Sequence, residues 1–162
     1  MVVVSDTSPI ANLIVINRLD LLHTLFEEII VPAAVDKEIR QLQQSGKNIQ
    51  AYEEATWFKI LEAKETEKVN KLKADLDAGE AEAIAIALEL KCDLLLMDER
   101  LGTNIAEKEG LFTIGLLGLL IKAKQKGIIN EIKPLMVDLK EKAGFWIGTK
   151  LFEQILRDEH EY

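Results

Sequence analysis

The sequence predicts an α/β protein in which a parallel sheet carries helices on both faces. Short β-branched or apolar runs alternate with amphipathic runs along the chain, and this alternation favours parallel strands joined by right-handed crossovers. The run from Leu94 to Met97 is apolar without a break, which suits a parallel strand covered on both faces. An aspartate follows two of the expected strands, Asp6 after the first and Asp98 after the fourth.

Length and composition predict one compact domain. A chain of 162 residues is long enough to bury a single core, and 48% hydrophobic with 30% charged residues describes a folded protein. We expect a single domain over residues 1–162, with a C-terminal helical and edge-strand extension from about residue 131. Cys92 is the only cysteine, which excludes an internal disulfide and favours a reducing cytoplasm.

Membrane insertion and a broad basic surface are both disfavoured. The N-terminus lacks the basic region of a signal peptide, and the most apolar run, Leu111 to Ile121, is too short to span a bilayer. The net charge of -8 argues against binding nucleic acid mainly through a basic face. It leaves room for a nuclease with a small acidic metal site.

The first strand is expected at Val2–Val4, ending at Ser5-Asp6. Ser8 then offers an N-cap and Pro9 the first helical position. Further along, Pro32 is expected to start a helix on which Val35, Ile39 and Leu42 form the apolar stripe and Glu38 lies on the flank. The remaining expected elements are helix 19–26, strand 29–31, helix 49–55, strand 57–61, a linker or exposed helix at 62–75, strand 111–114, helices 116–126 and 131–142 around Gly127, edge strand 145–147 and helix 149–157.

The helix expected from Leu76 to Leu90 places one glutamate unusually. At 100° per residue, Glu80 lies at the centre of the apolar stripe, whereas Glu82 and Glu89 point the opposite way and suit a solvated face. The stripe consists of Ala83, Ile84, Ala87, Leu88 and Leu90. A structural alternative exists, because Asp77-x-x-Glu80 has the spacing of a capping box.

Four acids would share one crevice if the first and fourth strands are neighbours, since their carboxyl ends then meet at the switch point of the sheet. The four are Asp6, Glu38, Glu80 and Asp98. Carboxylates that share a site raise one another's pKa, and oxygen-only ligands select hard cations such as Mg²⁺ or Mn²⁺. The cluster therefore predicts metal-dependent phosphodiester hydrolysis.

Each acid also has a structural interpretation. Asp98 could be only the N-cap of a helix that begins at Glu99, and Glu38 could be a solvated flank. Asp6 is harder to explain as a cap, because Ser8-Pro9 already supplies one.

Other sites have weaker support. His23 and His160 have no partners at zinc spacing, and the chain has no P-loop, G-x-S-x-G or G-x-G-x-x-G motif. The larger aromatic residues are interpreted as core or interface residues: Trp57, Phe58, Trp146 and Phe152.

These motifs together resemble a PIN domain over nearly the whole chain. The resemblance rests on Asp6-Thr7-Ser8 after a hydrophobic strand, on Glu38, on the run Gly-Glu-Ala-Glu-Ala-Ile at 79–84, and on Leu-Leu-Met-Asp-Glu-Arg at 95–100. With Gly-Leu-Leu-Gly at 115–118, the chain is similar to stand-alone prokaryotic VapC-like proteins. It differs where relatives tend to have a threonine, at Leu116, and in having Glu99 in place of a spaced second aspartate.

The resemblance implies a three-layer α/β/α sandwich with a five-stranded parallel sheet and cleavage of single-stranded RNA with Mg²⁺ or Mn²⁺. It assigns catalysis to four acids, three of them metal ligands (Asp6, Glu80 and Asp98) and one an outer residue (Glu38). Thr7, Ser8 and Glu99 would support the site. Many similar proteins are toxins held by a small antitoxin, and they often form homodimers.

Two functions from other classes are alternatives to a nuclease. A non-catalytic PIN-like module that binds a partner protein would keep the same acids as caps and solvated groups. A phosphoacceptor receiver fits poorly, because the first strand ends in one acid, Asp6, where a receiver needs an adjacent acidic pair.

Overall fold

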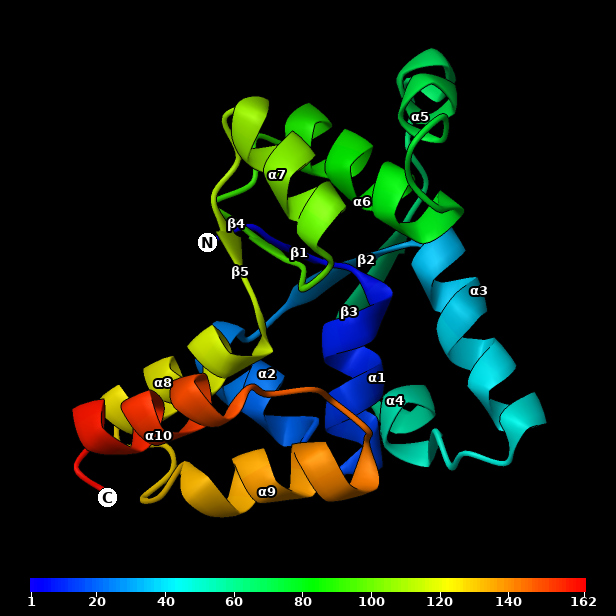
Figure 1. Ribbon diagram of the computed structural model, residues 1–162. Coiled ribbons are helices and arrows are strands. Elements are labelled where there is room, and N and C mark those ends of the chain that lie inside the picture. The colour runs from blue at the N-terminus through cyan, green and yellow to red at the C-terminus, as the bar shows by residue number, and fades with distance from the viewer.

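The computed structural model describes residues 1–162 and contains a five-stranded sheet with helices packed on both faces (Figure 1). All four strand pairs are parallel, and the strand order is β3-β2-β1-β4-β5. The five strands are β1 (Val3–Ser5), β2 (Ile29–Pro32), β3 (Phe58–Leu61), β4 (Leu94–Leu96) and β5 (Thr113–Ile114). The predicted α/β/α sandwich is therefore confirmed.

Ten α-helices and one 3₁₀ helix connect and cover the strands. Before β4 these are α1 (Thr7–Val15), α2 (Asp20–Phe26), α3 (Ala33–Gln41), η1 (Leu42–Ser45), α4 (Gln50–Glu54), α5 (Thr66–Leu72) and α6 (Ala78–Glu89). After β4 they are α7 (Arg100–Lys108), α8 (Leu116–Gln125), α9 (Lys133–Lys142) and α10 (Thr149–Asp158). None of these helices has both the length and the apolar character that a membrane span requires.

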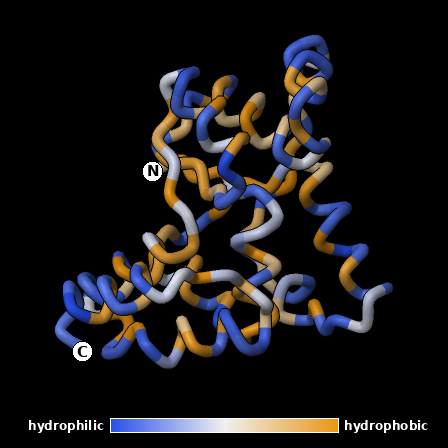
Figure 2. Tube along the Cα trace, viewed as in Figure 1, coloured by the Kyte–Doolittle hydropathy of each residue, from blue (hydrophilic) through white to orange (hydrophobic).

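Alternate side chains of the strands point into two separate cores. In β1, Val3 packs into one core and Val4 into the other, and in β4 the same division holds for Leu96 and Leu95. Parallel strands covered on both faces are expected to be apolar throughout; β1 is orange beside the N label of the chain trace (Figure 2), whereas the edge strand β3 includes Lys59. Each face of the sheet thus has a helical layer of its own.

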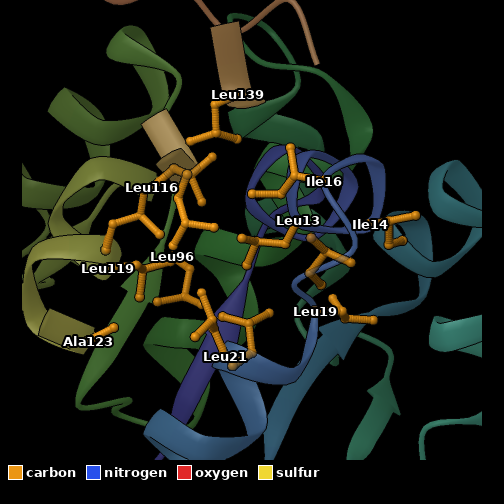
Figure 3. Close-up of a cluster of buried hydrophobic side chains, with 14 of the residues drawn as sticks. Leu13, Ile14, Ile16, Leu19, Leu21, Leu96, Leu116, Leu119, Ala123 and Leu139 are labelled. Carbon is orange, nitrogen blue, oxygen red and sulfur yellow. The ribbon is translucent and has the colours of Figure 1, made fainter. Parts of the chain in front are cut away.

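The larger core lies between the sheet and helices α1, α2, α8, α9 and α10. Figure 3 shows Leu13 of α1 and Ile16, the residue after this helix, together with Leu96, Leu116 and Leu139 in this core. The C-terminal helices thus share one core with the strands. The smaller core lies under α5, α6 and α7 and is filled by small and medium side chains of α6, including Ala83, Ile84 and Ala87.

Two expectations about where helices begin are wrong. Helix α1 begins at Thr7 with Asp6 in the N-cap position, so Ser8 and Pro9 already lie inside the helix. Pro32 ends β2 and is the N-cap of α3, which begins at Ala33. In both places the strand runs into the helix with no intervening loop, so the helix start is set by where the strand ends.

The edge strand expected at 145–147 does not form. Gly144 has a positive φ of 65°, and the Phe145 amide donates to the Leu139 carbonyl at 2.9 Å. The segment therefore folds back on the end of α9 and does not pair with the sheet, whose edges are β3 and β5.

Helix α6 is not solvated on the face opposite Glu80, contrary to the expectation. Glu82 accepts hydrogen bonds from the amides of Ala34 at 2.7 Å and Ala63 at 3.3 Å. Glu89 accepts two more at 2.8 Å, from Lys64 and Glu65 just before α5. Leu90, placed in the apolar stripe, is 40% exposed. Glu82 thus ties α6 to the first turn of α3, and both glutamates tie it to the segment that follows β3.

Candidate active site

Two aspartates lie at the carboxyl ends of adjacent strands. Val3, Val4 and Ser5 of β1 pair with Leu94, Leu95 and Leu96 of β4, and the Asp6 amide extends this pairing by donating to the Leu96 carbonyl at 2.9 Å. Asp98 follows β4 by two residues. The first and fourth strands are neighbours, which is the condition on which the shared crevice depended. After β1 the chain continues to β2 on one side, and after β4 to β5 on the other, which makes this the switch point where ligand sites of open α/β sheets occur.

Asp6, Asp98 and six other residues line one open hollow of about 450 Å³ at this edge of the sheet. All seven residues that the sequence nominated are among them, together with Asp77. The lining residues are Asp6, Thr7, Ser8, Glu38, Asp77, Glu80, Asp98 and Glu99. Six of the eight are acids and none is a cation, so the hollow has a strongly negative potential when its carboxyl groups are ionised.

Asp98 is held by the start of α8. Its Oδ1 accepts a hydrogen bond of 3.0 Å from the Leu116 amide, and its Oδ2 is buried without any hydrogen-bond partner. Burial raises the pKa of Asp98 above its usual value, while the Leu116 amide acts in the opposite direction. The structural alternative for Asp98 is wrong, because Glu99 is the residue that caps α7. An unpartnered buried carboxylate oxygen calls for a ligand or a proton.

Gly115 makes the Asp98 position possible. A Cβ atom at residue 115 would lie 2.5 Å from Asp98 Oδ1, which is closer than any normal contact. The absence of a side chain therefore lets the aspartate reach the first amides of α8. Gly115 is the first glycine of the Gly-Leu-Leu-Gly run at 115–118, but nothing in the sequence indicates that Asp98 lies next to it.

Asp6 is the most perturbed acid of the hollow. It is only 4% exposed, and no backbone amide is capped by its side chain although it occupies the N-cap position of α1. The pKa of Asp6 is raised from 3.8 to about 7, chiefly by burial; the Thr7 amide acts against the rise, and the charges of Glu80, Asp77 and Glu38 add to it. Such a group is poised to bind either a proton or a cation near neutral pH.

Glu80 has a structural role that uses half of its carboxylate. Its Oε1 accepts from the Asp77 amide at 3.0 Å, and Asp77 Oδ1 accepts in return from the Glu80 amide at 2.8 Å. The capping box is therefore present. No hydrogen bond engages Glu80 Oε2, and Glu80 is 9% exposed. Burial raises the pKa of Glu80 above its usual value, and the Asp77 amide acts against the rise.

Glu38 reaches the hollow from α3 and is held by α1 and α6. Its Oε2 accepts a hydrogen bond from the Thr7 hydroxyl. Both of its carboxylate oxygens would lie 2.9 Å from a Cβ atom at residue 79, so Gly79 provides the space that the carboxylate occupies. Glu38 is therefore a packed and hydrogen-bonded residue, which excludes a freely solvated flank.

The supporting residues have mainly structural contacts. Glu99 caps α7 by accepting from the amides of Leu101 at 3.0 Å and Gly102 at 2.5 Å. Ser8 Oγ accepts from the side-chain amide of Asn12 at 3.2 Å, one turn later in α1. As the side chains stand, no three His, Cys, Asp or Glu residues are arranged so that they could hold a metal ion.

A family model described as a PIN domain matches residues 2–161. The chain belongs to the PIN domain family. PIN domains are in general metal-dependent nucleases, and nucleic acid is the general class of ligand that membership implies. A search of curated proteins found no match to the chain.

The residues of this PIN domain fit a hard divalent cation in their chemistry. The hollow offers only oxygen donors among its charged groups, as Mg²⁺ and Mn²⁺ prefer. Asp98 Oδ2 is a buried acceptor without a partner, and Asp6 carries no side-chain cap bond. Glu80 and Glu38 are each engaged through one oxygen by the fold. The fit therefore rests first on the two strand-end aspartates.

Proposed function

We propose that the protein is a Mg²⁺- or Mn²⁺-dependent endoribonuclease that hydrolyses phosphodiester bonds of single-stranded RNA. We also propose that it acts in the cytoplasm as a VapC-like toxin, held by a small antitoxin and assembled as a homodimer. Membership of the PIN domain family supports a nuclease, and the resemblance of the Gly-Glu-Ala-Glu-Ala-Ile run to VapC-like chains supports the narrower assignment.

One observation carries the proposal. Asp6 and Asp98 are brought together from sequence positions 92 residues apart by the pairing of β1 with β4. Both have a raised pKa at the edge of one hollow, where Asp6 is buried and Asp98 is half-buried with a buried Oδ2. A fold gains no stability from carboxylates that are desolvated with incomplete hydrogen bonding, as Asp6 and Asp98 are. Their retention is explained by a function that uses them.

We assign the roles from the contacts of each side chain. Asp98 through Oδ2 and Asp6 would hold the cation, with Glu80 Oε2 as a third ligand or as the group that orients the attacking water. Glu38 would act as an outer residue that fixes the Thr7 hydroxyl at the start of α1. When bound, a divalent cation polarises a phosphodiester and lowers the pKa of a water.

The protein's own groups also act on the substrate. The six acids would repel a polyanion from the empty hollow, so substrate approach depends on neutralisation of Asp6 and its neighbours. Glu80 Oε2 is free of hydrogen bonds and can accept a proton from a water that lies between it and the scissile bond. Ser8 and Thr7 place hydroxyl groups on the same rim.

The Asp98→Asn and Asp6→Asn variants test the proposal. Each should reduce Mn²⁺-dependent cleavage of single-stranded RNA by about 100- to 1,000-fold, the usual cost of removing one charge-stabilising group. Asp75→Asn is the matched control, because Asp75 is exposed and outside the hollow, and it should cleave at the wild-type rate. Equal cleavage by wild type and Asp98→Asn would exclude the site.

A second function is favoured by one specific observation. Glu38, Glu80 and Glu99 all accept hydrogen bonds within the fold, and no three acids stand ready to hold a metal. A non-catalytic PIN-like module that binds a partner protein would show the same contacts. Such a module would neither bind Mn²⁺ nor cleave RNA in the assay above.

A further inference from the structure

Trp146 is the most exposed large hydrophobic residue of the chain, at 85%. Its neighbours on both sides face inward, because Ile147 is buried in the larger core and Phe145 packs against it. The segment is therefore anchored on one side and presents an indole ring on the other. An anchored, exposed tryptophan marks an interaction site, since the ring gains free energy only when a partner covers it.

A groove of about 360 Å³ lies beside Trp146, formed by residues between 140 and 149. The only ionisable residue in its lining is Lys140. We call it the Trp146 groove. Its character is opposite to that of the acidic hollow, because it combines an aromatic ring, backbone and one cation in a chain of net charge -8.

The lysines near the Trp146 groove are not neutralised by carboxylates. Lys140 makes no ion pair, and its Nζ lies 4.9 Å from the centre of the Phe152 ring. Lys150, next to the groove on α10, makes no ion pair either, whereas Lys142 pairs with Asp138 at 3.5 Å. Lys140 lines the groove and Lys150 follows its lining residue Thr149, so this surface offers positive charge that would complement a polyanion.

Glycine keeps one side of the ring clear. A Cβ atom at residue 148 would lie 3.2 Å from Trp146 Cη2, so any side chain there would press on the indole. Gly144, with its positive φ, makes the turn that brings the segment back over α9. The indole therefore lies beside the Gly148 backbone on one side, and Trp146 stays 85% exposed on the surface.

The Trp146 groove and the acidic hollow are supported by the same core. The Phe145 amide bonds to Leu139, and Leu139 lies in the cluster that contains Leu116 (Figure 3). The Leu116 amide in turn holds Asp98. A continuous set of packed residues therefore fixes the groove relative to the carboxylates.

We propose that the Trp146 groove is a subsite for single-stranded RNA, in which a nucleobase stacks on Trp146 and Lys140 binds the adjoining phosphate. The proposal rests on the proposed nuclease function and adds the residues that position its substrate. Bases of any sequence stack on aromatic rings in single-strand binding proteins, with lysine and arginine beside the backbone. An exposed aromatic ring, one lysine and no acid in the groove fit this ligand better than they fit a basic protein surface.

Binding in the presence of a chelator tests the subsite without any cleavage. The Trp57→Phe protein retains Trp146 as its only tryptophan, and a single-stranded oligouridylate should quench its fluorescence. Trp146→Ala should weaken binding of the fluorescein-labelled oligonucleotide by about 5- to 100-fold, the usual effect of losing one stacked base. Lys140→Ala should weaken binding and reduce its salt dependence by about one counterion.

Phe112→Ala is the matched control, because Phe112 is 75% exposed and lies outside the Trp146 groove. It should bind the oligonucleotide as wild type does, and Trp146→Phe should recover most of the lost affinity. Equal affinity of wild type and Trp146→Ala would overturn the subsite, even if the enzyme cleaves RNA. Quenching of Trp146 in a protein that never cleaves RNA would support the subsite and overturn only the nuclease.

A second copy of the chain is the competing occupant. In that case analytical ultracentrifugation would show a dimer that Trp146→Ala converts to a monomer, and the oligonucleotide would leave Trp146 fluorescence unchanged. This combination would overturn the RNA subsite.

Discussion

The two sides of the acidic hollow are built differently. On one side Asp6 and Asp98 follow strands β1 and β4, so the backbone of the sheet fixes them; Asp6 is buried, and Asp98 is half-buried with a buried Oδ2. On the other side Glu38 and Glu80 project from helices and accept hydrogen bonds from Thr7 and Asp77. Desolvation of Asp6 and Asp98 destabilises the fold when these acids are ionised, whereas Glu38 and Glu80 contribute hydrogen bonds that stabilise it.

This difference separates functional from structural interpretations of the same residue type. A carboxylate that caps a helix or accepts a hydroxyl would be retained for stability alone. A buried carboxylate with a raised pKa and an unpartnered oxygen destabilises the protein unless something binds it. The aspartates are therefore the residues on which the proposed chemistry depends most.

The largest expected effect is on the pH dependence of stability without metal. The pKa of Asp6 is raised from 3.8 to about 7 in the folded protein, so between these values the folded state holds a proton that the unfolded state has lost. The contribution of Asp6 to the free energy of unfolding should therefore be greatest below pH 4 and should be lost as the pH rises to about 7. One pKa unit is about 1.4 kcal/mol, so the loss should be about 2–4 kcal/mol.

Denaturant unfolding in a chelator at pH 5 and pH 8 measures this effect. Asp6→Asn should flatten the dependence and leave a smaller slope of the same sign, because burial also raises the pKa of Asp98 and Glu80. Glu38→Gln serves as the comparison from the helix-borne side and should leave most of the dependence in place. A pH profile identical in wild type and Asp6→Asn would contradict the burial argument.

A smaller effect, on the cleavage rate, is expected when one methyl group is added to either side of the hollow in two separate variants. Gly115→Ala places a Cβ atom 2.5 Å from Asp98 Oδ1, and Gly79→Ala places one 2.9 Å from both oxygens of Glu38. Asp98 must leave the Leu116 amide, so Gly115→Ala should reduce cleavage by about 10- to 100-fold, in line with the cost of misplacing a reacting group.

Gly79→Ala should reduce cleavage less than Gly115→Ala, because the Glu38 carboxylate is the end of a longer and more flexible side chain. Steady-state cleavage rates of the two variants, measured beside their melting temperatures, separate loss of activity from loss of fold. The reverse order of activities would mean that the helix-borne side carries the chemistry.

The sequence predicts correctly those features that depend on the pattern of a single helix or strand. The unbroken apolar run before Asp98 predicts a buried strand and places an acid at its carboxyl end, and Glu80 stands out within its own helix. The parallel order of strands followed from the alternation of elements. These features depend on periodicity, which is local.

The sequence does not predict features that depend on contacts between segments far apart in the chain or on how a turn redirects a segment. Glu82 faces away from the apolar stripe of α6, yet it is satisfied by amides of Ala34 and Ala63 that only the fold brings near. Phe145 and Ile147 alternate with Trp146 as a strand would, but Gly144 turns them back onto α9. The capping-box spacing explains Asp77 as a helix cap but does not indicate that Asp77 also lines the hollow.

Titration with Mn²⁺ tests the central claim most directly. In isothermal calorimetry and thermal unfolding, wild type and Asp75→Asn should bind Mn²⁺ and melt at a higher temperature with it, since a ligand of the folded state stabilises by mass action. Asp98→Asn and Asp6→Asn should lose both responses. If wild type neither binds Mn²⁺ nor shifts its melting temperature, the acids of the hollow do not form a metal site and the nuclease proposal fails.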